Sequence, residues 1–135
     1  MLLGINPLLT GPLLAALDQM GHGEMLVVAD ANYPAYRHGP TLALPGIGNI
    51  PALQAVTSVF PLDPEEPVSI MVPAEGPLPI TDEMYQALGT AGRGPLETIG
   101  RFEFYDLAAS ARLVLQTGER RPYGCIALRK GVIAP

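Results

Sequence analysis

Apolar residues near the start of the chain recur at the spacing of an amphipathic helix. The segment Thr10-Gly11-Pro12 precedes them, and proline suits the first helical position because its missing N–H would have no partner there. Gly21 is expected to end the helix in the left-handed conformation. The residues on one face of the 3.6-residue period are Leu13, Leu14, Leu17 and Met20.

Runs of strand length, dominated by apolar residues, follow this helix. Met25–Ala29 and Val68–Val72 contain no charged residue, as is typical of strands buried on both faces of an α/β sheet. Residues 31–48 are rich in proline and glycine, so we expect a long loop there with one short strand. The other predicted strands are Thr41–Leu44, Glu97–Ile99, Arg112–Thr117 and Cys125–Leu128.

Three further helices complete the pattern. Asn49 is expected to cap one and Thr81 a second, shorter one. The third is expected around Phe104–Ala111. Helices and strands thus alternate along residues 1–135, which favours a single α/β domain. The predicted architecture is a three-layer α/β/α sandwich with a mostly parallel, partly mixed sheet.

The composition narrows the possible functions. Hydrophobic residues make up 48% of the chain but aromatic residues only 6%, so the core must be aliphatic. The 8 basic residues form no stripe against 13 acidic ones, which argues against a nucleic-acid partner. No apolar run approaches the roughly 20 residues of a membrane helix, so no membrane partner is expected. Cys125 is the only cysteine, which excludes an intrachain disulfide and fits a cytoplasmic location.

The sequence has none of the common motifs for metal ions or cofactors. There is no His-Glu-x-x-His, no pair of cysteines and no Gly-Lys-Ser/Thr phosphate loop. Residues 46–51 begin like a dinucleotide fingerprint but have Pro51 where the third glycine belongs, which favours a turn. We therefore expect neither a metal site nor a cofactor.

His22 and Asp30 flank the first predicted strand and are candidates for chemistry. His22 lies between two glycines after a helix whose C-terminus would favour the protonated ring, so the ring is poised to donate a proton. The alternative is a histidine that only caps that helix. Asp30 ends the strand, where ligands bind in open α/β sheets, and the alternative is a cap for the following turn.

Arg101 and Tyr123 are candidates for contacts to a polar ligand. Arg101 stands beside Phe102, and a guanidinium next to aromatic rings can present a fixed fork to hydroxyl groups or a carboxylate. Its alternative is a surface ion pair. Tyr123 occupies a late turn, where its ring could stack on a sugar or simply pack on the edge of the sheet.

These segments together resemble the fucose mutarotase and ribose pyranase family. The resemblance spans nearly the whole chain, and the joint order of the short motifs is specific. Gly23 after His22 and the arginine segment are similar to the fucose branch, whereas the ribose branch has threonine after this histidine and lacks that arginine segment. The matching segments are Gly4–Leu9, Met20–Gly23, Ala29–Pro34, Arg101–Tyr105, Thr117–Gly124 and Lys130–Val132.

The resemblance implies an isomerase that interconverts the α and β anomers of a free aldose, with L-fucose as the favoured sugar and no cofactor. It assigns proton transfer to His22, and sugar contacts to Asp30, Arg101 and the Tyr123-Gly124-Cys125 segment. Histidine suits this role, because acid–base groups work best with a pKa near the operating pH.

Two positions depart from the fucose branch. Cys125 replaces its usual asparagine, and Asn32 stands where histidine is frequent. Cysteine is a weak donor and acceptor, so these changes bear on the sugar that is bound. Two alternatives stay open: a ribose-type pyranase, and a non-catalytic sugar-binding module on the same fold.

The spacing of His22 and Asp30 also bears on assembly. If a turn leads from His22 directly into the strand, residues at roughly 3.3 Å each separate the two by up to about 26 Å, which a monosaccharide cannot bridge. Either the strand starts late and bends, or a neighbouring chain brings its own His22 or Tyr123 to this Asp30. The resemblance implies the second arrangement, in ring-shaped homo-oligomers with sites at subunit contacts.

Overall fold

Six strands form one mixed sheet through the computed structural model, which describes residues 1–135. The strands are β1 (Met25–Ala29), β2 (Thr41–Leu44), β3 (Val68–Met71), β4 (Leu96–Ile99), β5 (Leu113–Thr117) and β6 (Ile126–Arg129). Their order in the sheet is β2-β5-β1-β6-β3-β4. Only β6 runs antiparallel to its neighbours, β1 and β3. The other pairs are parallel, so the predicted mostly parallel, partly mixed sheet is confirmed.

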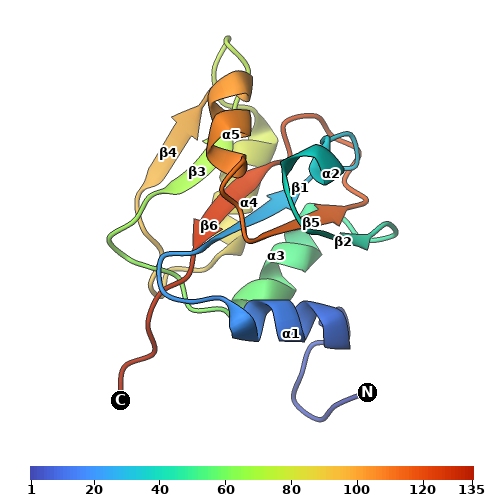
Figure 1. Ribbon diagram of the computed structural model, residues 1–135. Helices are drawn as coiled ribbons and strands as arrows, with labels where there is room; N and C mark the ends of the chain where they lie inside the picture. Colours follow the sequence, from blue (N-terminus) through green and yellow to red (C-terminus); the bar gives the residue numbers. More distant parts are fainter.

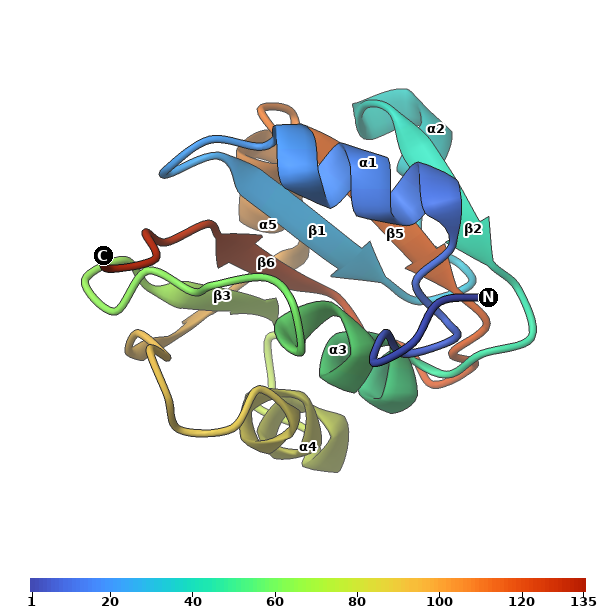
Figure 2. The ribbon, with the colours of Figure 1, turned by 90° about the horizontal axis from the view of Figure 1, so that it is seen from below.

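Helices cover both faces of the sheet, which confirms the three layers. Figure 1 shows α1 and α3 below the strands and α2 and α5 above them, and Figure 2 gives the view from the α1 side. None of these helices is both long and apolar enough to span a membrane. The helices are α1 (Gly11–Gln19), α2 (Ala35–His38), α3 (Asn49–Thr57), α4 (Pro79–Ala87) and α5 (Arg101–Ala108).

Successive side chains of β1 enter two different cores. Leu26 and Val28 belong to the larger core, which also holds buried residues of α1, α3 and α4. Val27 and Ala29 belong to the smaller core on the α5 side. Burying an aliphatic side chain contributes about 1.5–3 kcal/mol, so β1 is stabilised from both faces. This double burial explains why the run contains no polar residue.

The starts of α3 and α4 differ from the prediction. Gly48 is the N-cap of α3, while the Asn49 amide donates to the carbonyl oxygen of Gly124 at 3.3 Å. Asn49 is therefore used for a long-range contact and not as a cap. Thr81 lies in the first turn of α4, where its hydroxyl accepts the N–H of the true N-cap, Leu78, at 3.1 Å.

Two further segments correct the sequence-based assignment. Helix α5 begins at Arg101 rather than near Phe104, which places Arg101 in its first turn. The segment 31–48 was predicted as a loop with one strand, and it also contains the short helix α2. Four residues are too few to establish a helical period among so many prolines and glycines.

A lysine, and not His22, stabilises the end of helix α1. The ammonium of Lys130 donates to the carbonyl oxygens of Leu17 at 2.7 Å and Met20 at 2.6 Å. A cation is favoured at this end by the helix dipole. The left-handed residue is Gly23, with φ of 81°, so the expectation of that conformation at Gly21 is wrong.

The sheet topology decides which side chains can share a site. The carboxyl ends of parallel strands meet at one edge of a sheet. Asp30 after β1, Met71 at the end of β3 and Arg101 after β4 therefore lie at this edge. Because β6 runs the other way, Cys125 just before its start lies there too. His22 precedes β1 and so lies toward the opposite edge.

Gly118 follows the end of β5 and lies close to the backbone of residues 45–47. Its N–H donates to the carbonyl oxygen of Ile47 at 2.6 Å, and a Cβ at this position would collide with the carbonyl oxygen of Pro45. We expect Gly118→Ala to lower the free energy of unfolding by up to about 3 kcal/mol, because the obstacle is backbone and cannot rotate away. Urea unfolding measures the change.

Gly46→Ala is the matched control, since nothing lies within 4 Å of the Cβ that it would add. It should unfold near the wild-type midpoint. Equal midpoints for the two alanine variants would contradict the close approach at Gly118.

Candidate active site

A cavity of about 240 Å³ opens at the edge where the parallel strands end. It is smaller than the roughly 300–1,000 Å³ of sites for drug-sized ligands, and so suits a small molecule. Its wall combines a carboxylate, a guanidinium and three tyrosine rings. The lining residues are Asp30, Asn32, Tyr33, Met71, Arg101, Tyr105, Pro122 and Tyr123.

Asp30 is held by three hydrogen-bond donors. Its Oδ1 accepts the backbone N–H of Asn32 at 3.0 Å. Its Oδ2 accepts the backbone N–H of Gly124 at 3.1 Å and the thiol of Cys125 at 3.4 Å. These donors make it possible to bury a carboxylate that is only 4% exposed. Two carboxylate oxygens offer about four lone-pair sites, so one remains for a hydroxyl group in the cavity.

Gly124 and Cys125 lie behind Asp30 and not in the cavity wall. Burial raises the pKa of the Cys125 thiol, and the charge of Asp30 adds to this, so the thiol stays protonated and donates. A Cβ at position 124 would lie 2.8 Å from Nδ2 of Asn49 and 3.1 Å from Cγ of Glu119. Gly124 and Cys125 therefore contact Asp30 from behind and do not line the cavity themselves.

Glu119 fixes the loop that carries Tyr123. Its carboxylate accepts the backbone N–H of Arg121 at 3.0 Å and the guanidinium of the same residue at 3.1 Å. This guanidinium holds the pKa of Glu119 below its ordinary value, and it also pairs with Glu83 of α4 at 2.6 Å. In the loop so held, Tyr123 has φ of 62°, the only positive value outside glycine.

Arg101 is oriented by a group of aromatic side chains. Its Nε donates to the Tyr105 hydroxyl at 3.0 Å, as the i,i+4 spacing on a helix allows. The Tyr105 ring packs edge-on against Tyr33 with centroids 5.6 Å apart. Burial raises the pKa of Tyr33, so its hydroxyl stays protonated, and it forms a hydrogen bond with Nδ1 of His38 at 2.7 Å. The guanidinium is thus held by Tyr105, whose ring is packed against that of Tyr33.

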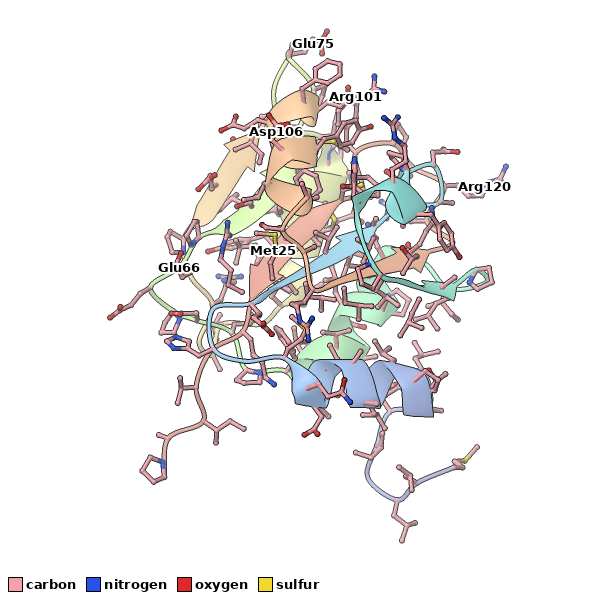
Figure 3. The ribbon with its side chains drawn as sticks, viewed as in Figure 1. Met25, Glu66, Glu75, Arg101, Asp106 and Arg120 are labelled. Carbon is pink, nitrogen blue, oxygen red and sulfur yellow. The ribbon has the colours of Figure 1, made fainter.

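His22 lies apart from this cavity. Its Nε2 is 2.9 Å from Oδ2 of Asp63, and it lines a second hollow with the loop 63–66 and Val132. Figure 3 shows the separation, since Arg101 lies near the top of the view and Glu66, from the rim of the second hollow, lies far to the left.

Strand β1 is extended from its beginning and does not bend toward the cavity. The N–H of Gly23 donates to the carbonyl oxygen of Lys130, and the Lys130 N–H donates to that of Glu24. Extended backbone from Glu24 to Asp30 spans about 20 Å at roughly 3.3 Å per residue. Of the two arrangements that the sequence left open, a late and bent strand is therefore wrong. Within one chain, His22 does not reach a sugar bound at Asp30.

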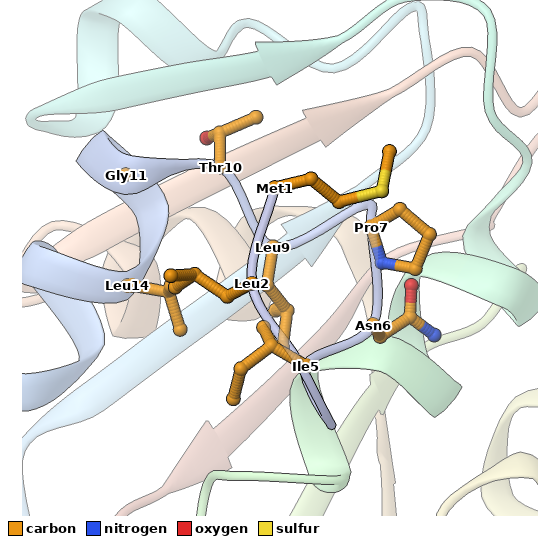
Figure 4. Close-up of a pocket in the computed structure, with 9 residues that line it drawn as sticks. All are labelled: Met1, Leu2, Ile5, Asn6, Pro7, Leu9, Thr10, Gly11 and Leu14. Carbon is orange, nitrogen blue, oxygen red and sulfur yellow. The ribbon is translucent and has the colours of Figure 1, made fainter.

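A larger hollow of about 460 Å³ lies at the N-terminal segment, on the α1 side of the sheet (Figure 4). Its lining carries no ionisable side chain and is dominated by apolar residues such as Ile5, Leu9 and Leu14. It therefore lacks the carboxylate, guanidinium and imidazole side chains that lie at Asp30, Arg101 and His22. The chemistry of the chain is concentrated at Asp30 and at His22.

The comparison with known proteins assigns the family. The profile of the RbsD / FucU transport protein family matches residues 3–133. The chain belongs to this family. The L-fucose mutarotase of Actinobacillus pleuropneumoniae serotype 5b is 38% identical over 140 residues, covering 98% of this chain and 97% of that protein. The fucose mutarotase of Homo sapiens is 40% identical over 144 residues, covering 97% and 94%.

A solved structure agrees with the sequence comparison. The fucose mutarotase of Streptococcus pneumoniae, determined in complex with L-fucose, has a TM-score of 0.86 and 28% identity, and the match covers 98% of this chain and 100% of that chain. The fold and the family that the sequence motifs implied are therefore confirmed. The chain is a full-length relative of proteins known as fucose mutarotases.

The site residues expected in the RbsD / FucU family separate into three groups. Asp30, Arg101 and Tyr123 line one cavity, Gly124 and Cys125 support Asp30 from behind, and His22 lies at the opposite edge. Asn32, which the sequence singled out as a departure from the fucose branch, also lines the cavity. Sequence reasoning missed the remaining lining residues, Tyr33, Met71, Tyr105 and Pro122. Tyr105 had a readable signal, since it lies four residues after Arg101 on a helix. Met71 had none, because it reads only as the end of a buried strand.

Tyr123 carries a backbone conformation that glycine adopts without strain. A non-glycine residue with positive φ costs about 1–3 kcal/mol, so we expect Tyr123→Gly to change the free energy of unfolding by less than about 1 kcal/mol, despite the lost ring. Tyr33→Ala, at a position only 5% exposed, should cost about 3–5 kcal/mol. Urea unfolding compares the two, and an equal loss would mean that the Tyr123 backbone is unstrained.

Proposed function

We propose that this chain is a mutarotase that interconverts the α and β anomers of a free aldose, with L-fucose as the sugar. One observation carries the proposal: a polar cavity, with Asp30, Arg101 and Tyr123 in its wall, in a chain whose full-length relatives are fucose mutarotases. The buried thiol of Cys125, the only cysteine, is compatible with work in the cytoplasm.

The cavity has the groups that a monosaccharide requires. The carboxylate of Asp30 accepts bonds from sugar hydroxyl groups, and the guanidinium of Arg101 donates to sugar oxygens. The ring of Tyr123 offers an apolar face to the C–H bonds of the sugar and a hydroxyl at its rim. No negative ligand is needed to balance Arg101, since Asp30 lies in the same wall.

An apolar part of the wall distinguishes a deoxy sugar. Met71 and Pro122 are the lining residues without a polar side-chain group. L-fucose has a methyl group where L-galactose, otherwise identical, has a hydroxymethyl group. An apolar surface favours the methyl group, but rejects an added hydroxyl only by about 10²-fold.

The reaction needs proton transfer and nothing else. The bond between the anomeric carbon and the ring oxygen breaks, the anomeric hydroxyl loses its proton, and the ring oxygen gains one. Rotation of the free aldehyde and reversal of these steps give the other anomer. His22 supplies the acid–base group, and such groups accelerate reactions by about 10²–10⁴.

Because His22 and Asp30 lie at opposite edges, the proposed site is completed by a second subunit. A contact between the His22 end of one chain and the Asp30 end of the next joins two different surfaces. Such contacts form a closed ring when the rotation from one subunit to the next completes a full turn, and this is the arrangement that we propose. Exposed apolar side chains are available at both ends: Phe102 beside Arg101 at the cavity, and Val132 beside His22.

A non-catalytic sugar-binding module is the second candidate. The observation that favours it is the same separation, because one chain contains the binding cavity without the proton donor. The module would bind sugar as the enzyme does, but would not change the rate at which the anomers exchange.

Saturation-transfer NMR on an equilibrated sugar distinguishes these candidates. We expect accelerated exchange of L-fucose, slower exchange of L-galactose, and loss of the acceleration by about 10²-fold or more in His22→Ala with sugar binding retained. Ribose belongs in the same panel as the test of the pyranase alternative. Binding without exchange in the wild-type protein would leave only the binding module.

Mixed oligomers test whether the site is shared. His22→Ala and Asp30→Ala, each inactive alone, are dissociated and reassembled together. In random mixtures about one quarter of the contacts join an intact His22 to an intact Asp30, so about one quarter of the activity should return. Asp30→Ala mixed with Arg101→Ala is the control, because both defects lie in the same half of the site. No recovery in the first mixture would rule the shared site out.

A further inference from the structure

His22 has a carboxylate partner that comes from a distant part of the chain. Oδ2 of Asp63 lies 2.9 Å from Nε2 of the imidazole, although 41 residues separate the two in sequence. The His22 side chain is 62% exposed, whereas that of Asp63 is only 12% exposed. The carboxylate is thus covered by the protein while most of the ring faces outward.

Asp63 is fixed from both sides. Its Oδ1 accepts the backbone N–H of Glu65 at 3.0 Å. Its own N–H donates to the carbonyl oxygen of Arg129 at 3.1 Å, and the preceding Leu62 forms a bridge to Lys130. The carboxylate therefore lies at the start of the loop 63–66, where the backbone is anchored to the end of β6.

The protonation of this pair follows from the contacts. The Glu65 N–H, and then the hydrogen bond with His22, hold the pKa of Asp63 below its ordinary value. An ionised carboxylate only accepts hydrogen bonds. Nε2 of His22 must then be the donor, and in the neutral ring the lone pair lies on Nδ1.

We propose that Asp63 is a positioning residue, which holds Nε2 of His22 and leaves Nδ1 as the nitrogen that exchanges a proton with the sugar. This inference rests on the proposed mutarotase function. In the opening direction, the Nδ1 proton of the charged ring passes to the ring oxygen of the sugar, the anomeric C–O bond breaks, and water accepts the proton of the anomeric hydroxyl. Closure reverses each transfer, so the count of protons is unchanged.

Other charged groups near His22 are already occupied or exposed. The carboxylate of Glu24 accepts the N–H of Gly21 at 2.9 Å and lies 3.5 Å from Arg112. The ammonium of Lys130 is bonded to the end of α1. Glu65 and Glu66 line the same hollow but form no side-chain hydrogen bond to the ring.

Nitrogen-15 NMR reads the tautomer without any activity. At a pH well above the ordinary histidine pKa of about 6.5, we expect the wild-type His22 to be protonated on Nε2. The chain has only two histidines, so His22→Ala identifies the other signal as His38. In Asp63→Ala the His22 signals should move to a mixture of tautomers, while those of His38 stay unchanged.

Kinetics supply the second readout. We expect Asp63→Ala to lower kcat about 10- to 100-fold with KM changed less than about twofold, and Asp63→Glu to restore part of kcat. Glu66→Gln removes a charge of the same sign from the same loop and should leave the His22 tautomer unchanged.

The outcomes separate this inference from the function on which it rests. A wild-type protein without anomer exchange contradicts the mutarotase, and the tautomer still decides whether Asp63 holds Nε2. A wild-type His22 protonated on Nδ1, or an Asp63→Ala variant with wild-type kcat and a folded spectrum, overturns the positioning role. A kcat lost equally in Asp63→Ala and Glu66→Gln would be a charge effect, and would overturn it too.

Discussion

The antiparallel strand β6 is the constraint on which the rest of the structure depends. It pairs with β1 on one side and β3 on the other, and so joins the parallel group β2-β5-β1 to the parallel pair β3-β4. Its two ends meet the two halves of the proposed site. At its start Cys125 donates to Asp30, and just after its end the backbone of Lys130 pairs with Gly23 beside His22. Within one chain, this strand therefore fixes the distance between the two half-sites, which belong to two different sites of the proposed ring.

The division of chemistry between two edges follows from this topology. Parallel strands bring their carboxyl ends together, which collects the carboxylate, the guanidinium and the tyrosine rings in one wall. A residue that precedes a parallel strand lies at the opposite edge of the sheet. A small shift of β1 would therefore not bring His22 to the cavity at Asp30. The imidazole of His22 and the cavity at Asp30 are therefore supported by different segments. Asp63 and the end of β6 hold the imidazole, and α5 with the loop 118–125 holds the cavity wall.

The elements could be predicted from the sequence where burial alone decides them. Runs such as Met25–Ala29 are buried on both faces, and their apolar composition reports this directly. The caps could not be predicted as well, because polar residues near a helix start have competing uses. Asn49 has the side chain of a cap, but its amide serves a carbonyl group 75 residues away. Lys130 stabilises α1 from the far end of the chain, and no local pattern indicates it.

The same limit applies to the site. Asp30 could be proposed from its place after a buried strand, and Arg101 and Tyr123 from their neighbours and the family motifs. Asp63 gave no signal, because its partner lies 41 residues earlier and the two meet only through the pairing of β6. The sequence implied that Cys125 contacts the sugar. In the structure it is a buried donor to Asp30 and does not line the cavity.

The capping of α1 by Lys130 has a practical consequence for labelling. Lys130 is the only lysine of the chain, and in the folded protein its amine is engaged by the carbonyl oxygens of Leu17 and Met20. An acylating reagent can modify this side chain only when the last turn of α1 opens and releases it. Acylation at Lys130, measured separately from that of the exposed α-amine of Met1, then reports the rate of that local opening. A modified lysine, having lost its charge, no longer stabilises the end of the helix.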